Sequence, residues 1–182
     1  MMEKIVTSPR RTLFAAAVGA CMAIASTSLW AADAKAKNWA APAHKMYGQT
    51  LVDFQMAKHK ELLSVTLHGT PPGEKDIYTM FAGSFPERIG NPDDADDIDV
   101  IKKGITILDP RWKRVNDKDK KFVVLLPMRD VKGDNVGLVV YAFKNPPKMV
   151  GMEEFYLKAS NKLRDELGRK IASYDGLFAA VK

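Results

Sequence analysis

The sequence has little cysteine and lacks several catalytic motifs. Among its 182 residues the only cysteine is Cys21, which excludes an internal disulfide and any zinc or iron–sulfur site built on several cysteines. No CxxCH motif for covalent haem occurs, and no GxSxG motif surrounds a serine nucleophile. We therefore predict a protein without catalytic activity.

Positive charge is present but is not concentrated. The formal net charge is +6 at pH 7, yet no run of lysines and arginines is interleaved with aromatic residues as in nucleic-acid-binding patches. We therefore expect no nucleic-acid partner. Hydrophobic residues make up 46% and charged residues 27% of the chain. This composition excludes global disorder and suits one domain of ordinary size.

Residues 1–32 have the pattern of a secretory signal peptide. A basic start with Lys4, Arg10 and Arg11 precedes an apolar, alanine-rich stretch over residues 13–24, and small residues follow at the cleavage region. A membrane anchor is the alternative, but the apolar stretch is short and is followed by serine and threonine. We expect a periplasmic protein with no stable membrane span after the signal is cleaved.

Two other export signals overlap this segment. The run Arg10-Arg11-Thr12-Leu13-Phe14 resembles a twin-arginine signal, which would export a folded protein that carries a cofactor. Pro9 precedes the pair, however, and no lysine follows. Cys21 ends a partial lipobox, yet the apolar stretch continues beyond it. The Sec pathway is therefore favoured over the twin-arginine route, and a lipoprotein is not expected.

After a flexible lead-in at residues 33–42, residues 43–182 are expected to form a single domain. Apolar residues three and four apart predict helices, whereas apolar–polar alternation and short β-branched runs predict strands. The predicted helices are 43–60, 95–103 and a long one from 152 onward; the predicted strands are 62–67, 77–82, 104–108, 122–126 and 136–143.

The predicted strands differ in their expected burial. In the first strand, Leu63, Val65 and Leu67 should share one face, opposite Ser64, Thr66 and His68. The two strands 122–126 and 136–143 are almost purely apolar, so we expect them to be adjacent, central and buried on both faces. A hairpin turn should join them.

The helices carry expectations of their own. Asp93 or Asp94 should cap the helix 95–103, and Gly104 should end it. The aspartates that follow the cap suit the positive end of the helix dipole, and their spacing does not match a calcium loop. In the last helix, apolar residues recur at every fourth position, which predicts one buried stripe along the helix. The residues of this stripe are Phe155, Ala159, Leu163, Leu167 and Ile171.

Neighbouring elements are close in sequence, so the strands should form an antiparallel sheet. The predicted fold class is α+β, a five-stranded antiparallel sheet with long N- and C-terminal helices. Four groups of residues strengthen this: His68-Gly69-Thr70-Pro71-Pro72-Gly73, Arg88-Ile89-Gly90, the run from Asp96 to Gly104, and Leu125-Leu126-Pro127-Met128-Arg129-Asp130 with Val136-Gly137-Leu138-Val139. In these runs the chain resembles exported PAS-like/Cache-like sensor domains.

The resemblance covers residues 55–172, and its motifs are mostly turn and packing residues. It implies sensing or binding of a small molecule outside the cytoplasm, in domains that are often fused to a membrane helix and a signalling output. We recognise no second membrane span and no output domain in the sequence. We therefore expect a free-standing PAS-like/Cache-like module with a binding role.

The resemblance also implies where the ligand lies, between the sheet and the crossover segment 84–118. Arg88, Arg111 and Trp112 could then form a cationic fork and an aromatic wall for a carboxylate ligand. Tyr78, Arg129 and Tyr141 could contribute from the strands. Each of these side chains also has a structural interpretation, as a core or surface residue.

Two other functions stay open. The three histidines, His44, His59 and His68, could hold a non-covalent haem or a metal ion, although no pair has the spacing of helical metal ligands. We expect no cofactor by default. Alternatively, an exposed apolar stripe over residues 152–178 would make the domain a protein-interaction module that pairs through its terminal helices, for instance as a homodimer.

Overall fold

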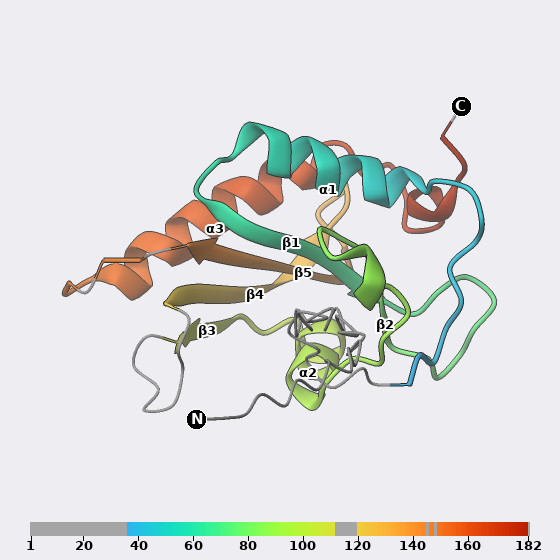
Figure 1. Cartoon of the computed structure of the whole chain (residues 1–182), viewed down its shortest axis with the longest axis horizontal. Helices are drawn as coiled ribbons and strands as arrows, with labels where there is room; N and C mark the ends of the chain where they lie inside the picture. Colours follow the sequence, from blue (N-terminus) through green and yellow to red (C-terminus); the bar gives the residue numbers. More distant parts are fainter. Residues whose placement is uncertain (1–35, 112–119, 145, 148, 182) are drawn as a thin grey trace, which may run out of the picture. The chain divides into compact units, whose positions relative to one another are not determined.

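The computed structural model describes residues 36–111, 120–144, 146–147 and 149–181 (Figure 1). The described residues all belong to one compact unit, Asp33–Lys182. The predicted signal peptide therefore lies outside the described residues. Within them, no helix combines the length and the apolar character that crossing a membrane requires.

The described part of the chain forms one five-stranded antiparallel sheet with the strand order β2-β1-β5-β4-β3. The α+β fold class and the antiparallel sheet are thus confirmed. The elements in chain order are α1 (Tyr47–Lys58), β1 (Leu62–Gly69), β2 (Thr79–Gly83), η1 (Pro86–Arg88), α2 (Ala95–Lys103), β3 (Ile107–Pro110), β4 (Lys121–Arg129), β5 (Asn135–Lys144), α3 (Met152–Gly168) and η3 (Asp175–Phe178).

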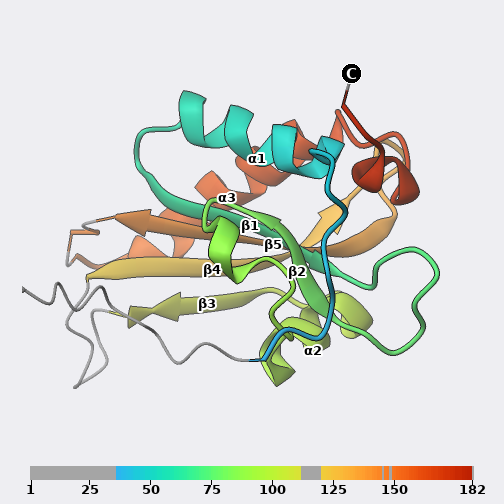
Figure 2. The same ribbon diagram turned by 45° about the vertical axis from the view of Figure 1, so that its right-hand side comes forward.

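Helices cover the two faces of the sheet unequally. In both ribbon views α1 and α3 lie on one face, and the short α2 lies on the other (Figures 1 and 2). The first face carries the main core, which includes Val65, Leu67, Leu126, Tyr141 and Phe143. A smaller cluster on the second face packs around Val100 of α2. The second face therefore has room for a site.

β4 and β5 are the central hairpin of the sheet. They pair antiparallel, with Leu125 opposite Val140 and Leu126 opposite Val139. Successive side chains of a strand point to opposite faces, so each strand contributes to both clusters. The prediction that these two runs are adjacent strands buried on both faces is confirmed.

A bulge in β1 corrects the expected pattern of that strand. Leu62 pairs with Phe143 while Ser64 pairs with Ala142, so Leu63 is an extra residue in the ladder. Leu62, not Leu63, joins the core with Val65 and Leu67, and Leu63 is 42% exposed. The prediction for Leu63 was therefore wrong, because period-two alternation fails wherever a bulge inserts a residue.

The stripe of α3 also differs from the prediction. The buried residues of the helix are Met152, Tyr156, Ser160, Leu163, Leu167 and Gly168, whereas Phe155 is 59% exposed. With 3.6 residues per turn, a strict spacing of four drifts by about 40° per step, so spacings of four and three must mix to stay on one face. Phe155 falls outside the stripe, and the buried Ile171 follows the end of the helix.

The two shorter helices are bounded by their flanking residues. In α2, the side chains of Asp94 and Asp97 each accept from the other residue's backbone N–H, and Gly104 ends the helix in the left-handed conformation at φ 66°. The predicted helix 95–103 is thus confirmed, as is its end. In contrast, α1 is shorter than the predicted 43–60, so His44 and His59 flank it.

The described part of the expected lead-in contacts the domain. The backbone N–H of Asn38 donates to the carbonyl of Gly90 at 2.9 Å. The Trp39 ring meets the Phe178 ring edge-on, with centroids 6.1 Å apart. Residues 36–42 therefore lie along the crossover side of the domain near β2.

Candidate functional site

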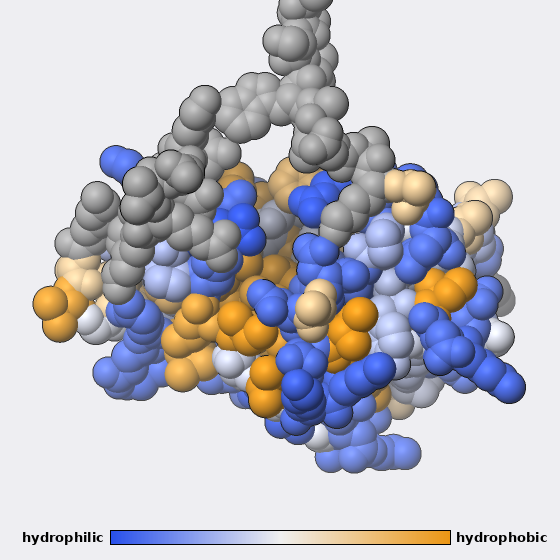
Figure 3. Space-filling model, turned by 90° about the horizontal axis from the view of Figure 1, so that it is seen from below, coloured by the Kyte–Doolittle hydropathy of each residue, from blue (hydrophilic) through white to orange (hydrophobic). Residues whose placement is uncertain are grey.

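A cavity lies on the second face of the sheet, the face that α2 covers only in part. Its volume is about 580 Å³, which is within the usual range for small-molecule sites. Figure 3 shows this side of the molecule, where apolar side chains gather between hydrophilic ones. The cavity is lined by residues of β1, β3, β4 and β5 and of the segment 85–97. This is the region between sheet and crossover in which the resemblance implied a ligand.

The floor of the cavity is apolar because the strands alternate. β4 contributes Val123 and Leu125, and β5 contributes Val140 and Ala142. Their neighbours in sequence, such as Val124 and Tyr141, point to the opposite face and belong to the main core. A ligand in the cavity would therefore rest on aliphatic side chains.

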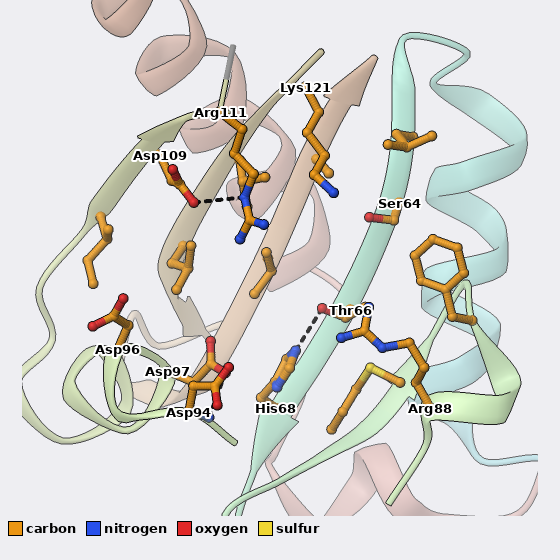
Figure 4. Close-up of a pocket in the computed structure, with 18 of the residues that line it drawn as sticks. Ser64, Thr66, His68, Arg88, Asp94, Asp96, Asp97, Asp109, Arg111 and Lys121 are labelled. Atoms are coloured by element: carbon orange, nitrogen blue, oxygen red, sulfur yellow. Dashed lines mark hydrogen bonds and ion pairs between the residues drawn. The ribbon is translucent and has the colours of Figure 1, made fainter. Parts of the chain in front are cut away.

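Three cationic side chains line the cavity. Arg88, at the end of η1, points into it beside Thr66 (Figure 4). Its guanidinium lies 5.8 Å from the centroid of the Phe85 ring and makes no hydrogen bond or ion pair with any described residue. Arg111 follows β3, and its Nε donates to Asp109 Oδ2 at 2.9 Å. Lys121 begins the neighbouring β4.

Carboxylates line another part of the same cavity. Asp94, Asp96 and Asp97 come from the N-terminus of α2, and in Figure 4 they lie at the far end of the site from Arg111 and Lys121. The cavity is thus electrically uneven: Arg111 and Lys121 lie at one end, together with Asp109, the α2 acids lie at the other, and Arg88 lies apart beside Thr66. Polar ligands that enter it will be oriented by this difference.

His68 lies near the acidic end of the cavity, in a chain of short hydrogen bonds. Its Nε2 lies 2.7 Å from Thr66 Oγ1, and its Nδ1 lies 2.7 Å from Asp93 Oδ1. Gly137 of β5 permits this arrangement, since at φ 145° a Cβ there would lie 2.6 Å from the His68 carbonyl oxygen. The chain of contacts holds both the imidazole and the threonine hydroxyl at the cavity wall.

Asp93 is the buried member of this chain. Its side chain is only 1% exposed, and burial raises the pKa of its carboxyl, an effect that the hydrogen bond from His68 opposes. The second oxygen, Oδ2, has no hydrogen-bond partner among the described residues. The backbone of Asp93 is fixed by its N–H, which donates to the Tyr78 carbonyl at 3.0 Å.

Hydroxyl, imidazole and carboxylate in this order can orient a proton. In serine hydrolases the same order of groups supplies a nucleophile, a base and an orienting acid. Here both ring nitrogens of His68 are engaged, by Thr66 and Asp93, so the chain of contacts fixes the Thr66 hydroxyl at the cavity wall. Sequence reasoning missed Thr66, Asp93 and Lys121. Thr66 could have been found from the sequence, because it alternates with apolar residues on the same strand face as Ser64 and His68. No local pattern indicates that Asp93 belongs to the site.

Two of the six predicted ligand-binding residues line the cavity, namely Arg88 and Arg111. Trp112 lies outside the described residues. The other three do not line the cavity. Tyr141 is fully buried in the main core, and Arg129 Nη1 donates to the Gly133 carbonyl in the β4–β5 turn at 2.8 Å.

Tyr78 packs against α2 instead, with Lys102 Nζ 4.9 Å from its ring centroid. Tyr78 precedes β2, and Arg129 is the last residue of β4, beyond the part of that strand that lines the cavity. For Tyr141 the physical reason is the orientation of its side chain. An aromatic or arginine in a strand faces the cavity only if its register places it on the second face. Composition alone does not reveal that register.

The three histidines do not form one site. His44 Nε2 lies 3.1 Å from the Phe178 carbonyl, while His59 contacts Glu61 and Glu166. These two flank the 12 residues of α1, which span about 18 Å. No single haem iron or metal ion can therefore contact all three, and only His68 lines the cavity.

No family model matches the chain, and no curated protein matches it. Among solved structures, the GAF domain of a two-component sensor histidine kinase from Bacillus halodurans is 12% identical with a TM-score of 0.45, over 68% of this chain and 92% of that one. The E. coli DcuS sensor domain is 15% identical, with a TM-score of 0.36 over 60% and 71%.

A third solved structure is the type II free methionine-R-sulfoxide reductase from Thermoplasma acidophilum. It is 13% identical with a TM-score of 0.39, over 68% of this chain and 90% of that one. These similarities are too low to assign the chain to a family. Its function is therefore argued from its own residues.

Proposed function

We propose that this chain is an exported, PAS-like/Cache-like domain that binds a small anionic molecule, with a carboxylate as the recognised group. The observation that carries the proposal is Arg88. Its guanidinium faces a cavity of about 580 Å³ and makes no hydrogen bond or ion pair with any described residue. A carboxylate could accept two hydrogen bonds from such a group, and these are among the stronger polar contacts in proteins.

The rest of the cavity supports this choice of ligand. Lys121 has no ion pair with a described residue and lies next to Arg111 across the β3–β4 pairing. Ser64 and Thr66 add hydroxyls, and the aliphatic floor would contact the body of the ligand. A small carboxylate with an apolar portion fits these groups. The proposal assigns binding and sensing, and no catalytic step.

The ligand is tested by mass spectrometry of native protein from the periplasm. We expect a co-purifying small carboxylate, which Arg88→Gln should bind about 10- to 100-fold more weakly. The matched control is Arg129→Gln, because Arg129 ends β4, contacts the β4–β5 turn and does not line the cavity. Equal affinities of the two variants would contradict the proposed site.

Export is the second part of the proposal, and it is supported by the signal pattern of residues 1–32. The mature chain should begin between Ala32 and Lys35. N-terminal sequencing of the exported protein tests this. Retention of Met1 in that fraction, or a lipid on Cys21, would contradict it.

The interaction-module alternative has less support. It required an exposed apolar stripe over 152–178, but Tyr156, Leu163, Leu167 and Leu177 are buried in the chain's own core. Phe155 is the exposed exception at 59%. Pairing of two copies through the terminal helices is testable by sedimentation velocity of the purified protein.

A further inference from the structure

A cluster of metal-ligating side chains lies beside the cavity. His68, Asp93 and Asp97 each offer one donor atom, and these three atoms lie within 4.8 Å of one another. None of these three residues belongs to the cationic side chains that would bind the carboxylate ligand. The cluster therefore has chemistry that the proposed function does not use.

Two elements and one connecting segment bring these donors together. His68 is in β1, and Asp97 is in the first turn of α2. Asp93 lies between η1 and α2, next to Pro92, which forms a β-bridge with Thr79. The bridge and the hydrogen bond from the Asp93 N–H to the Tyr78 carbonyl tie this segment to the start of β2, so each donor has a fixed backbone.

The buried carboxylate of Asp93 is the independent observation. Its side chain is 1% exposed, and Oδ2 has no hydrogen-bond partner among the described residues. A buried carboxylate with an unsatisfied oxygen is unfavourable unless a proton or a cation compensates it. Folded proteins seldom leave such an oxygen unsatisfied without a functional reason.

We propose that His68, Asp93 and Asp97 bind one divalent transition-metal ion of the Zn²⁺ or Mn²⁺ type. An imidazole with two carboxylates suits such ions, whereas Mg²⁺ and Ca²⁺ prefer oxygen ligands alone. The ion would replace the proton between His68 Nδ1 and Asp93 Oδ1. Neighbouring ligands on one ion with bonds of about 2.0–2.2 Å lie about 3.0–3.5 Å apart. The two atoms, 2.7 Å apart in the metal-free contact, would therefore separate by less than about 1 Å on binding.

Thr66 then becomes the outer partner of the site. With the metal on Nδ1, the proton of His68 moves to Nε2 and donates to Thr66 Oγ1, which lies 2.7 Å away. A hydroxyl serves in either direction, since it can donate or accept. Metal-bound histidines usually have such a partner on the other ring nitrogen.

Asp97 has to move slightly to complete the site. Its Oδ2 accepts from the Asp94 backbone N–H at 3.1 Å as part of the α2 cap. The side chain is only partly buried, so rotation toward His68 and Asp93 is available to it. The coordination positions not taken by the protein would be open to water or to an anion in the cavity.

Isothermal titration of the metal-stripped full chain with Zn²⁺ and, separately, Mn²⁺ tests this site. We expect one ion per chain and no saturable binding of Mg²⁺. Asp93→Asn and His68→Gln should weaken binding by about 100-fold, and Thr66→Val by about tenfold. Thermal unfolding without metal checks that each variant folds. If Asp93→Asn or His68→Gln does not fold, Thr66→Val still tests the site, because valine has nearly the shape of threonine.

Matched controls separate this site from surface binding. Asp96→Asn removes a cavity carboxylate outside the cluster, and His44→Gln removes a histidine outside the cavity; both should stay within about threefold of the parent affinity. Arg88→Gln should also keep its metal affinity, which distinguishes failure of the anion site from failure of the metal site. Absence of stoichiometric binding, or equal binding by the parent and Asp93→Asn, would overturn the proposal.

Discussion

His68 Nδ1 and Asp93 Oδ1 lie 2.7 Å apart, although 25 positions separate the two residues in the sequence. The contact ties β1 to the segment that leads into α2. It therefore links the sheet to the crossover at the cavity wall. Because the contact holds the imidazole at the cavity wall, we expect substitutions of Asp93 to change the position and hydrogen bonding of His68.

The first prediction concerns that contact. Asp93→Ala should be less stable than Asp93→Asn by about 1–3 kcal/mol, because alanine leaves the buried imidazole N–H without an acceptor while asparagine keeps one. Urea unfolding of the two metal-stripped variants measures the difference. Equal stabilities would mean that the contact with His68 does not hold the crossover.

The second prediction tests the bulge in β1. Leu126→Ala should destabilise the domain by about 2–5 kcal/mol, since Leu126 is fully buried in the main core. Leu63→Ala should change stability by less than about 0.5 kcal/mol, because Leu63 is 42% exposed. Denaturant midpoints of both variants provide the measurement. A large cost at Leu63 would place that side chain in the core after all.

The third prediction uses the space in the cavity. Ala142→Leu should fit with a cost below about 0.5 kcal/mol, since Ala142 borders the cavity. Its ligand affinity should nevertheless fall, because the added atoms occupy the ligand's space. Ala82→Leu is the matched control. Ala82 is fully buried in the packed core, where overpacking costs about 1–3 kcal/mol.

The fourth prediction is a pH dependence at the α1–α3 contact. A hydrogen bond from Lys58, supported by one from His59 at 3.1 Å, holds the pKa of the Glu166 carboxyl below its usual range. The stabilisation is therefore fully present above the unfolded pKa of about 4.3 and is lost as pH falls toward the lower folded pKa.

Accordingly, Glu166→Gln should cost roughly 0.5–1 kcal/mol at pH 7, a modest value because the pair is partly exposed. The difference from the parent should shrink below about pH 4. Glu154→Gln is the control: Glu154 pairs with Lys158 within α3 and is exposed, so its substitution should matter less. Unfolding curves from pH 3 to 8 give the comparison. A Glu166 effect that grows on acidification would contradict the assigned ion pair.

The strands and helices that depend on local patterns were predictable. Apolar runs of β-branched residues predicted the central hairpin, and an aspartate cap with a closing glycine predicted α2. Both signals act within a few residues, where steric and hydrogen-bonding preferences are decisive. Phe155 and Leu63 were misplaced because a helix drifts from a spacing of four and a bulge shifts a strand by one residue.

The candidate site was predictable only in part. Arg88 and Arg111 are in the crossover, whose placement over the sheet was implied by the resemblance to PAS-like/Cache-like domains. Tyr141 could not be excluded, since its register decides its face and a tyrosine suits either one. Asp93 and Thr66 could not be connected to His68, because their contact depends on how η1 and α2 pack against β1.

By itself, the sequence determined the signal pattern of residues 1–32, the α+β class and the central hairpin, since these depend on hydrophobic periodicity and on caps and turns. Only the tertiary structure decided which side chains share the cavity and that Asp93 is buried against His68. The physical reason is distance. Contacts between residues 25 positions apart depend on the register of the strands and on the packing of the crossover, and neither is encoded by any local pattern.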